Sequence, residues 1–278
     1  GCFAVKRLIK ITKGAYSALI FAFLYAPIAV LIIFSFNESK SRGSWGGFSL
    51  KWYESLLQNS EIMRSLFNTL LIAVLASLIA TAIGTAAAIG INSMNKRIQN
   101  AFMNISYIPV LNADIVTGVS LLVLFLFLGI PLGRISLLLA HISFNIPYVI
   151  LSVMPKLKQM NKHTYEAALD LGCSPLKALW KVVVPEIMPG VVTGAILAFT
   201  LSIDDFVISF FTTGAGVNTL SITIYSMVRR GVKPEINALS SIMFVVVLLL
   251  LVVVNIRSSK DVQKNNRHSS SNRSIGFR

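Results

Sequence analysis

Six long apolar runs constrain this chain more than any other feature of its sequence. A helix rises 1.5 Å per residue, so about 20 apolar residues cross the hydrocarbon layer of a bilayer. Only 13% of the residues are charged, and the mean hydropathy is +0.73. We therefore predict an all-α polytopic membrane protein, with one transmembrane domain over residues 1–256 and six transmembrane helices. The predicted spans cover residues 14–36, 66–91, 102–128, 134–154, 190–211 and 238–256.

The distribution of Lys and Arg predicts how these helices are oriented. Cytoplasmic loops of membrane proteins carry an excess of Lys and Arg. With a cytoplasmic N-terminus, 17 of the 25 basic residues fall in the inner segments 1–13, 92–101, 155–189 and 257–278. Both termini are therefore predicted to be cytoplasmic, and the polar, basic residues 257–278 are predicted to form a disordered tail. The net charge of +14 is spread over several loops, which argues against a nucleic-acid partner.

Three carboxylates lie inside the apolar runs, at Asp114, Asp204 and Asp205. Apart from Arg134 at the end of one run, no Lys or Arg accompanies them. Charged groups inside a membrane are costly and usually face a cavity or a partner. In the predicted topology Asp114 and Asp204 lie about 18 Å and about 21 Å from the cytoplasmic ends of their helices, at similar depth. A passing cation is one natural partner.

A passing cation is not the only partner that these acids could have. A buried Asp can be protonated and can hydrogen-bond to a neighbouring helix. It can also pair with an Arg from another subunit. His141 lies inside the fourth run, where a His is a candidate for a hydrogen bond between helices.

Among the predicted loops, the segment 155–189 is the one whose length and residue pattern predict regular secondary structure. The stretch "NKHTYEAALDLG" predicts a helix that Thr164 caps and that ends before Gly172. A second helix follows, with Ser174 as its N-cap and Pro185 as its end. A membrane-surface element and a protein-docking element both fit this composition.

The spacing within this loop is specific. Glu166, Ala167 and Ala168 are followed after three residues by Gly172, and then by "VVVP" ending at Pro185. This pattern resembles the EAA loop of ABC-importer permeases. In that family the loop forms a coupling helix that docks in a groove of the ATP-binding subunit. The resemblance implies an ATPase-coupling role for Glu166, Ala167, Ala168 and Gly172.

The resemblance extends over about residues 15–256. "YAPIAVLIIFSFN", "NADIVTGVSLLVLFLFLGIPLG" and "AFTLSIDDFVISFF" are similar to the PotC-type permeases of spermidine/putrescine importers. That family implies a type I ABC importer permease fold in the bacterial cytoplasmic membrane. It also implies a second homologous permease, two copies of an ATP-binding subunit and an extracytoplasmic polyamine-binding protein. The chain would then be the permease subunit of an ATP-driven polyamine importer, with a substrate pathway of Asp114, Asp204, Asp205 and Trp52.

The missing catalytic motifs and the presence of a loop that resembles an ATPase dock limit the possible functions of the chain. The chain has no G-x-x-x-x-G-K-[ST] phosphate loop, no hydrolase motif and no set of metal ligands, so we predict a transport subunit without an ATPase site. ATP and Mg²⁺ would belong to a partner subunit. An ABC permease for another cationic or small solute and a secondary cation transporter remain alternatives, although a secondary carrier needs no ATPase dock. Trp52 could offer a cation–π face to an amine or anchor the chain at the membrane interface.

Overall fold

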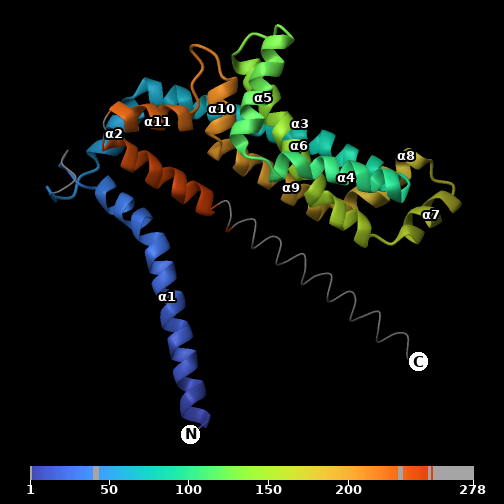
Figure 1. Cartoon of the computed structure of the whole chain (residues 1–278), viewed down its shortest axis with the longest axis horizontal. Coiled ribbons are helices and arrows are strands. Elements are labelled where there is room, and N and C mark those ends of the chain that lie inside the picture. The colour runs from blue at the N-terminus through green and yellow to red at the C-terminus, as the bar shows by residue number, and fades with distance from the viewer. Residues whose placement is uncertain (1, 40–43, 231–233, 250–251, 253–278) are drawn as a thin grey trace. The chain divides into compact units, whose positions relative to one another are not determined.

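The computed structural model describes residues 2–39, 44–230, 234–249 and 252, and these residues form helices joined by short loops (Figure 1). In this part of the chain, strand-like pairing is confined to one bridge between Asn37 and Phe48. The predicted all-α class is confirmed. The helices are α1 (Cys2–Ser35), α2 (Lys51–Gln58), α3 (Ser60–Asn92), α4 (Lys96–Leu111), α5 (Asp114–Phe127), α6 (Arg134–Gln159), α7 (Lys162–Asp170), α8 (Pro175–Ala178), the π-helical turn η1 (Leu179–Val183), α9 (Val184–Asp204), α10 (Val207–Thr212) and α11 (Leu220–Arg230).

Four or five of the six predicted spans are found among the described residues. Helices over Thr12–Ser35, Ser60–Asn92, Arg134–Gln159 and Pro175–Asp204 are long and apolar enough to cross a membrane. The pair α4 and α5, bent by 104°, makes a fifth if it is taken as one span. In the predicted sixth run the structure describes a shorter apolar helix, Glu235–Leu249. Residues 250–251 and 253–256 of that run, and the predicted tail 257–278, lie outside the described residues.

Two runs predicted as continuous helices are broken. The run 102–128 is interrupted between Leu111 and Asp114, where Asn112 and Ala113 have extended backbone. The run 190–211 is interrupted between Asp204 and Val207. Asn and Asp side chains compete for backbone hydrogen bonds and so favour helix ends, which hydropathy does not register.

The loop between α6 and α9 also departs from prediction at two points. The helix α7 begins at Lys162 because the side chain of Asn161, not that of Thr164, accepts a hydrogen bond from the first turn. Pro185 does not end the second helix, which continues from α8 through η1 into α9. The π-turn η1 ends two residues before Pro185, and a wider turn there is expected to relieve the clash that a proline ring makes with the carbonyl one turn back.

The chain divides into two compact units, one of residues 1–60 and 226–278 and one of residues 61–225. We call them unit 1 and unit 2 and describe each by itself. The single domain over residues 1–256 stays a prediction.

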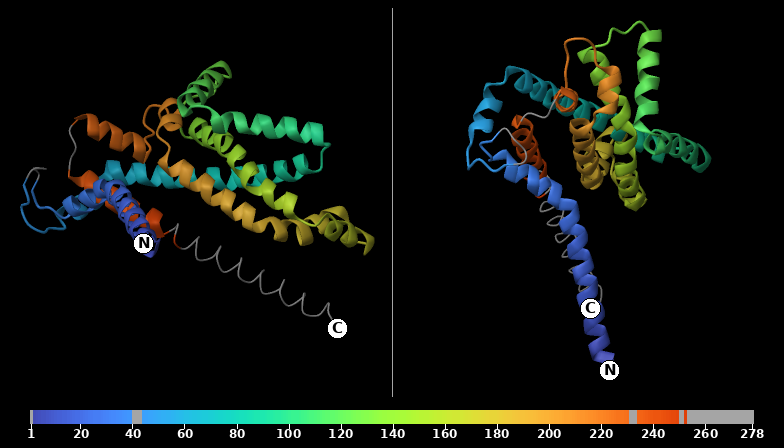
Figure 2. Two further views of the ribbon diagram at one scale, coloured as in Figure 1. Left: turned by 60° about the horizontal axis from the view of Figure 1, so that its bottom comes forward. Right: turned by 60° about the vertical axis from the view of Figure 1, so that its left-hand side comes forward.

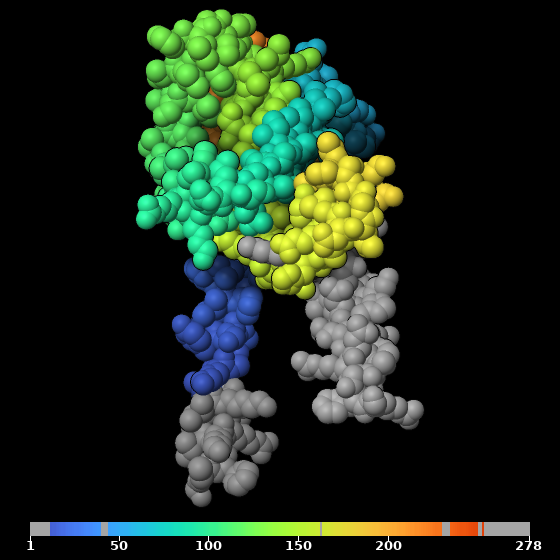
Figure 3. Space-filling model, turned by 90° about the vertical axis from the view of Figure 1, so that its right-hand side faces the viewer, coloured from blue at the N-terminus to red at the C-terminus, as the bar shows by residue number. Residues whose placement is uncertain are grey.

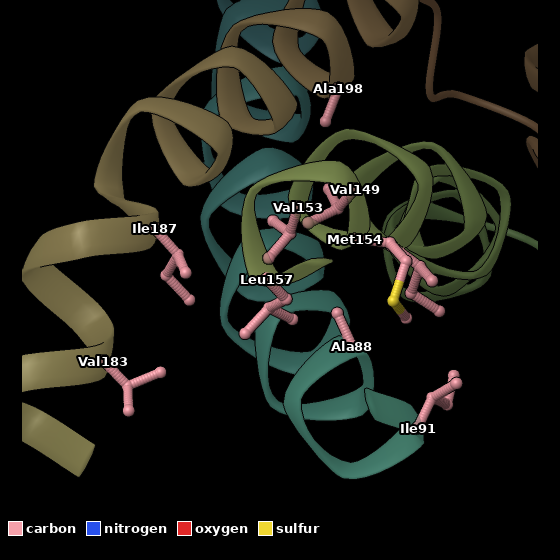
Figure 4. Packing of buried hydrophobic residues seen from close by; sticks show 10 residues of the cluster. Ala88, Ile91, Val149, Val153, Met154, Leu157, Val183, Ile187 and Ala198 are labelled. Atoms are coloured by element: carbon pink, nitrogen blue, oxygen red, sulfur yellow. The ribbon is translucent and has the colours of Figure 1, made fainter. Parts of the chain in front are cut away.

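The core of unit 2 is the contact between α6 and α9, which lie side by side in Figure 2. Close packing is possible because glycines face Val149 of α6. A Cβ on Gly84 of α3 would lie 2.8 Å from the Val149 side chain, and one on Gly194 of α9 would lie 3.3 Å from its Cα. The buried cluster in Figure 4 comprises Ala88, Ile91, Val149, Ile150, Val153, Met154, Leu157, Val183, Ile187 and Ala198.

The contact at Gly84 makes a prediction about stability. Gly84→Ala would push a methyl group into Val149, and overpacking of this kind costs about 1–3 kcal/mol. We expect a lower melting temperature in detergent. Gly90→Ala is the matched control on the same helix, because nothing lies within 4 Å of its Cβ position. There the better helix propensity of Ala should keep or raise the melting temperature. Equal melting temperatures for the two variants would contradict the packing shown here.

Candidate functional site

The three acids singled out in the sequence all lie at the two helix breaks. Asp114 is the first residue of α5, Asp204 is the last residue of α9, and Asp205 lies in the break that follows. Non-helical backbone at membrane depth is tolerated only where it is buried in protein or faces a water-filled cavity. Broken helices of this kind form the substrate and ion sites of many transporters.

The structure brings the two breaks to the same part of unit 2. The helices α5 and α10 pack against each other (Figure 1). A Cβ on Gly118, one turn after Asp114, would lie 3.1 Å from the Phe211 side chain and 3.5 Å from the Val207 carbonyl oxygen. The second turn of α5 is therefore in contact with the first turn of α10.

The three carboxylates have different surroundings. Asp114 and Asp204 are exposed, and neither side chain has a hydrogen bond or an ion pair with another described residue. The side chain of Asp205 is only 7% exposed. Its Oδ1 accepts a hydrogen bond from the backbone N–H of Ile208 at 3.1 Å, and its Oδ2 accepts one from the N–H of Ser209 at 2.7 Å.

Helix α6 presents buried polar side chains to this broken segment. Nε2 of His141 lies 3.0 Å from Oγ of Ser209 and 3.7 Å from Oδ2 of Asp205. One turn along, Nδ2 of Asn145 donates to Oγ of Ser202 at 2.7 Å. The predicted interhelical hydrogen bond of His141 is confirmed. The sequence analysis did not single out Asn145. Its position four residues after His141 in an apolar run places both polar side chains on one face of the helix, which could have indicated a shared polar contact.

Trp52, the fourth predicted pathway residue, belongs to unit 1. Its side chain is buried, and its indole N–H donates to the carbonyl of Asn37 at 2.6 Å. The ammonium group of Lys51 lies 5.8 Å from the centre of its ring. Oδ1 of Asn37 in turn accepts from the backbone N–H of Gly46, so Asn37 joins the loop after α1 to Trp52 of α2. The structure thus gives Trp52 a packing and hydrogen-bonding environment, and its contact with substrate stays a prediction.

Gly172 has the backbone conformation expected of a residue just past a helix end. Its φ is +83°, in the left-handed region that favours glycine. Its N–H donates to the Leu169 carbonyl at 2.9 Å, and the N–H of Cys173 donates to the Ala168 carbonyl at 3.1 Å. These two bonds form a Schellman motif. The predicted place of Gly172 at the end of α7 is confirmed.

The loop around Gly172 combines an exposed apolar surface with an anchored inner side. Figure 3 shows this segment, in yellow, at the surface of unit 2. Tyr165 and Val183 pack in the cluster that α6 and α9 build. Glu166 and Ala167 are exposed and Ala168 is half-buried. Large apolar side chains stand out beside them, with exposed fractions of 86% for Leu171, 70% for Leu176 and 64% for Trp180.

The helical fold with broken spans is that of an ABC importer permease. It resembles a bacterial alginate ABC transporter solved in complex with its alginate pentasaccharide-bound periplasmic protein. The TM-score is 0.70 at 17% sequence identity, and the match covers 92% of this chain and 96% of that chain. Residues 80–258 match the model of the family "Binding-protein-dependent transport system inner membrane component". The chain belongs to this family.

Within this family, the chain is similar to permease proteins of polyamine transport systems. The spermidine/putrescine transport system permease protein PotC of Escherichia coli (strain K12) is 40% identical over 237 residues, covering 85% of this chain and 90% of PotC. The putrescine transport system permease protein PotI of the same strain is 40% identical over 230 residues, covering 80% of this chain and 82% of PotI. The resemblance to PotC-type permeases is confirmed.

Proposed function

We propose that this chain is the permease subunit of an ATP-driven importer that carries polyamines such as spermidine and putrescine. The observation that carries the proposal is the position of Asp114 and Asp204, two exposed carboxylates at adjoining helix breaks. A polyamine presents ammonium groups separated by methylenes, so acids on two different helices can each bind one group through a charge-assisted hydrogen bond. The names of the relatives PotC and PotI support the same substrate class.

The exposed loop around Gly172 supports the proposed coupling to ATP. Glu166, Ala167 and Ala168 would face a groove of an ATP-binding subunit, and the exposed Leu171 and Trp180 would add apolar contact area. ATP and Mg²⁺ would then be bound by that partner, two copies of which would serve a pair of homologous permeases. An extracytoplasmic polyamine-binding protein would deliver substrate, as the solved alginate transporter carries a periplasmic protein.

Orientation is part of this proposal, with both termini cytoplasmic and the chain in a bacterial cytoplasmic membrane. In a background without Cys2 and Cys173, His163→Cys is expected to resist a membrane-impermeant thiol reagent in intact cells. Gln58→Cys is expected to react. Both positions are exposed, so a difference reports the side of the membrane and not burial. Reaction of His163→Cys from outside would contradict the orientation.

The proposal is tested by reconstituting the complete transporter in proteoliposomes. We expect uptake of radiolabelled spermidine or putrescine to require hydrolysable ATP and the binding protein. Uptake driven by an ion gradient without ATP would favour a secondary cation transporter. ATP-dependent uptake of another solute, with no competition from polyamines, would favour an ABC permease of different specificity.

A further inference from the structure

The two neighbouring acids at the second break differ in what they contact. We propose that Asp205 is a positioning residue, which fixes the break so that Asp204 faces the substrate, and that it is not itself a substrate ligand. This inference rests on the proposed polyamine pathway. It gives Asp204 the role of binding substrate and Asp205 the role of fixing the backbone.

The hydrogen bonds of Asp205 carry the first part of the argument. Both carboxylate oxygens are used, one on the N–H of Ile208 and one on the N–H of Ser209. These N–H groups belong to the first turn of α10, where no preceding turn can supply acceptors. An Asp in this place caps the helix. A cation approaching Asp205 would have to compete with two backbone donors for a side chain that is 7% exposed.

The polar side chains of α6 carry the second part. On one side of the break, Asn145 donates to Ser202 of α9 at 2.7 Å. On the other side, His141 lies 3.0 Å from the hydroxyl of Ser209 on α10. The last turn of α9 and the first turn of α10 are therefore both held against one helix. Polar contacts between membrane helices of this kind fix the positions of the backbones they join.

Asp204 is the residue that this arrangement leaves free. It lies between Ser202 and Asp205, both of which are held, and yet it is exposed and its side chain has no hydrogen bond or ion pair with another described residue. Its backbone position is consequently fixed while its carboxylate is available. The direction in which Asp204 points depends on the cap at Asp205.

The assignment is tested by making the same two changes at each acid. If Asp204 acts by charge, Asp204→Asn and Asp204→Ala should lower polyamine uptake alike. If Asp205 acts as a cap, Asp205→Asn should transport better than Asp205→Ala by about 2- to 30-fold, because the single side-chain oxygen of Asn can still accept one of the two backbone N–H groups whereas Ala accepts neither. Rates are compared at matched membrane abundance. Equal losses for Asp205→Asn and Asp205→Ala would overturn the proposal.

A second measurement reads the geometry directly. Asp204→Cys, in a background without Cys2 and Cys173, is labelled with a positively charged methanethiosulfonate reagent. Adding Asp205→Ala should change the labelling rate, whereas adding Asp205→Asn should change it much less. An identical rate in all three proteins would overturn the positioning role. If instead both Asp204 variants import polyamines at the wild-type rate, it is the proposed pathway that fails, whatever the labelling shows.

Discussion

Asp204→Asn is expected to lower the uptake of spermidine and putrescine by about 5- to 150-fold, since a charge-assisted hydrogen bond contributes about 1–3 kcal/mol. The Asn side chain keeps the size of Asp and loses its charge, so the change separates electrostatics from packing. Asp204 is exposed and its side chain has no hydrogen bond with another described residue, so no structural bond is lost. The measurement is the initial uptake rate of radiolabelled polyamine at matched membrane abundance.

Two further variants make this result specific. Asp114→Asn is expected to fall in the same range, because Asp114 is also exposed at a helix break. Glu54→Gln removes one negative charge from the exposed surface of α2 and should leave uptake unchanged. Wild-type rates in both Asp→Asn variants would mean that these carboxylates are structural and that the substrate passes elsewhere.

The second large effect is expected at the coupling loop. Gly172→Val should reduce ATP-driven uptake about tenfold or more and weaken co-purification of the ATP-binding subunit. A β-branched residue at a φ of +83° is strained by about 1–3 kcal/mol, and each 1.4 kcal/mol is a factor of ten in an equilibrium. Relief of that strain would open the Schellman motif and displace Glu166 and Ala167 relative to α8. Co-purification and uptake are measured together.

A matched control is available at Gly216, whose φ is +84° and which lies in the loop after α10. Nothing lies within 4 Å of the Cβ position of either glycine, so Gly216→Val introduces comparable strain away from the coupling loop. The ATP-binding subunit should still co-purify with Gly216→Val.

Glu166→Lys tests the coupling loop by charge reversal and is expected to weaken docking of the ATP-binding subunit. Normal docking and uptake in Gly172→Val and Glu166→Lys would refute the coupling role.

Hydropathy predicted the four or five spans found among the described residues, but it did not predict where the helices break. A run of apolar residues predicts a span whether or not a side chain inside it competes for backbone hydrogen bonds. Asp205 does compete, through the N–H groups of Ile208 and Ser209, and it ends α9. The same limit applies to the start of α7, where Thr164 was predicted as the cap and the cap is Asn161, because Asn and Thr both cap helices.

The acids of the candidate site were predictable, whereas the difference between Asp204 and Asp205 was not. Their placement in an apolar run made both conspicuous. What distinguishes them is the contact with α6, about 60 residues earlier in the chain, through His141 and Asn145. No local pattern encodes such a contact. The left-handed Gly172, by contrast, depends on its immediate neighbours and was predictable from them.

The uninterrupted course of helix from Pro175 to Asp204 has a mechanical consequence. Its first residues lie in the loop proposed to meet the ATPase, and its last residue is Asp204 itself. The helix α9 alone is about 31 Å long at 1.5 Å per residue, so a tilt of about 5° at the π-turn η1 would swing its tip by about 3 Å. That is the length of one hydrogen bond. A small tilt of the helix, started at the end proposed to meet the ATPase, would therefore be enough to form or break a hydrogen bond between Asp204 and an ammonium group.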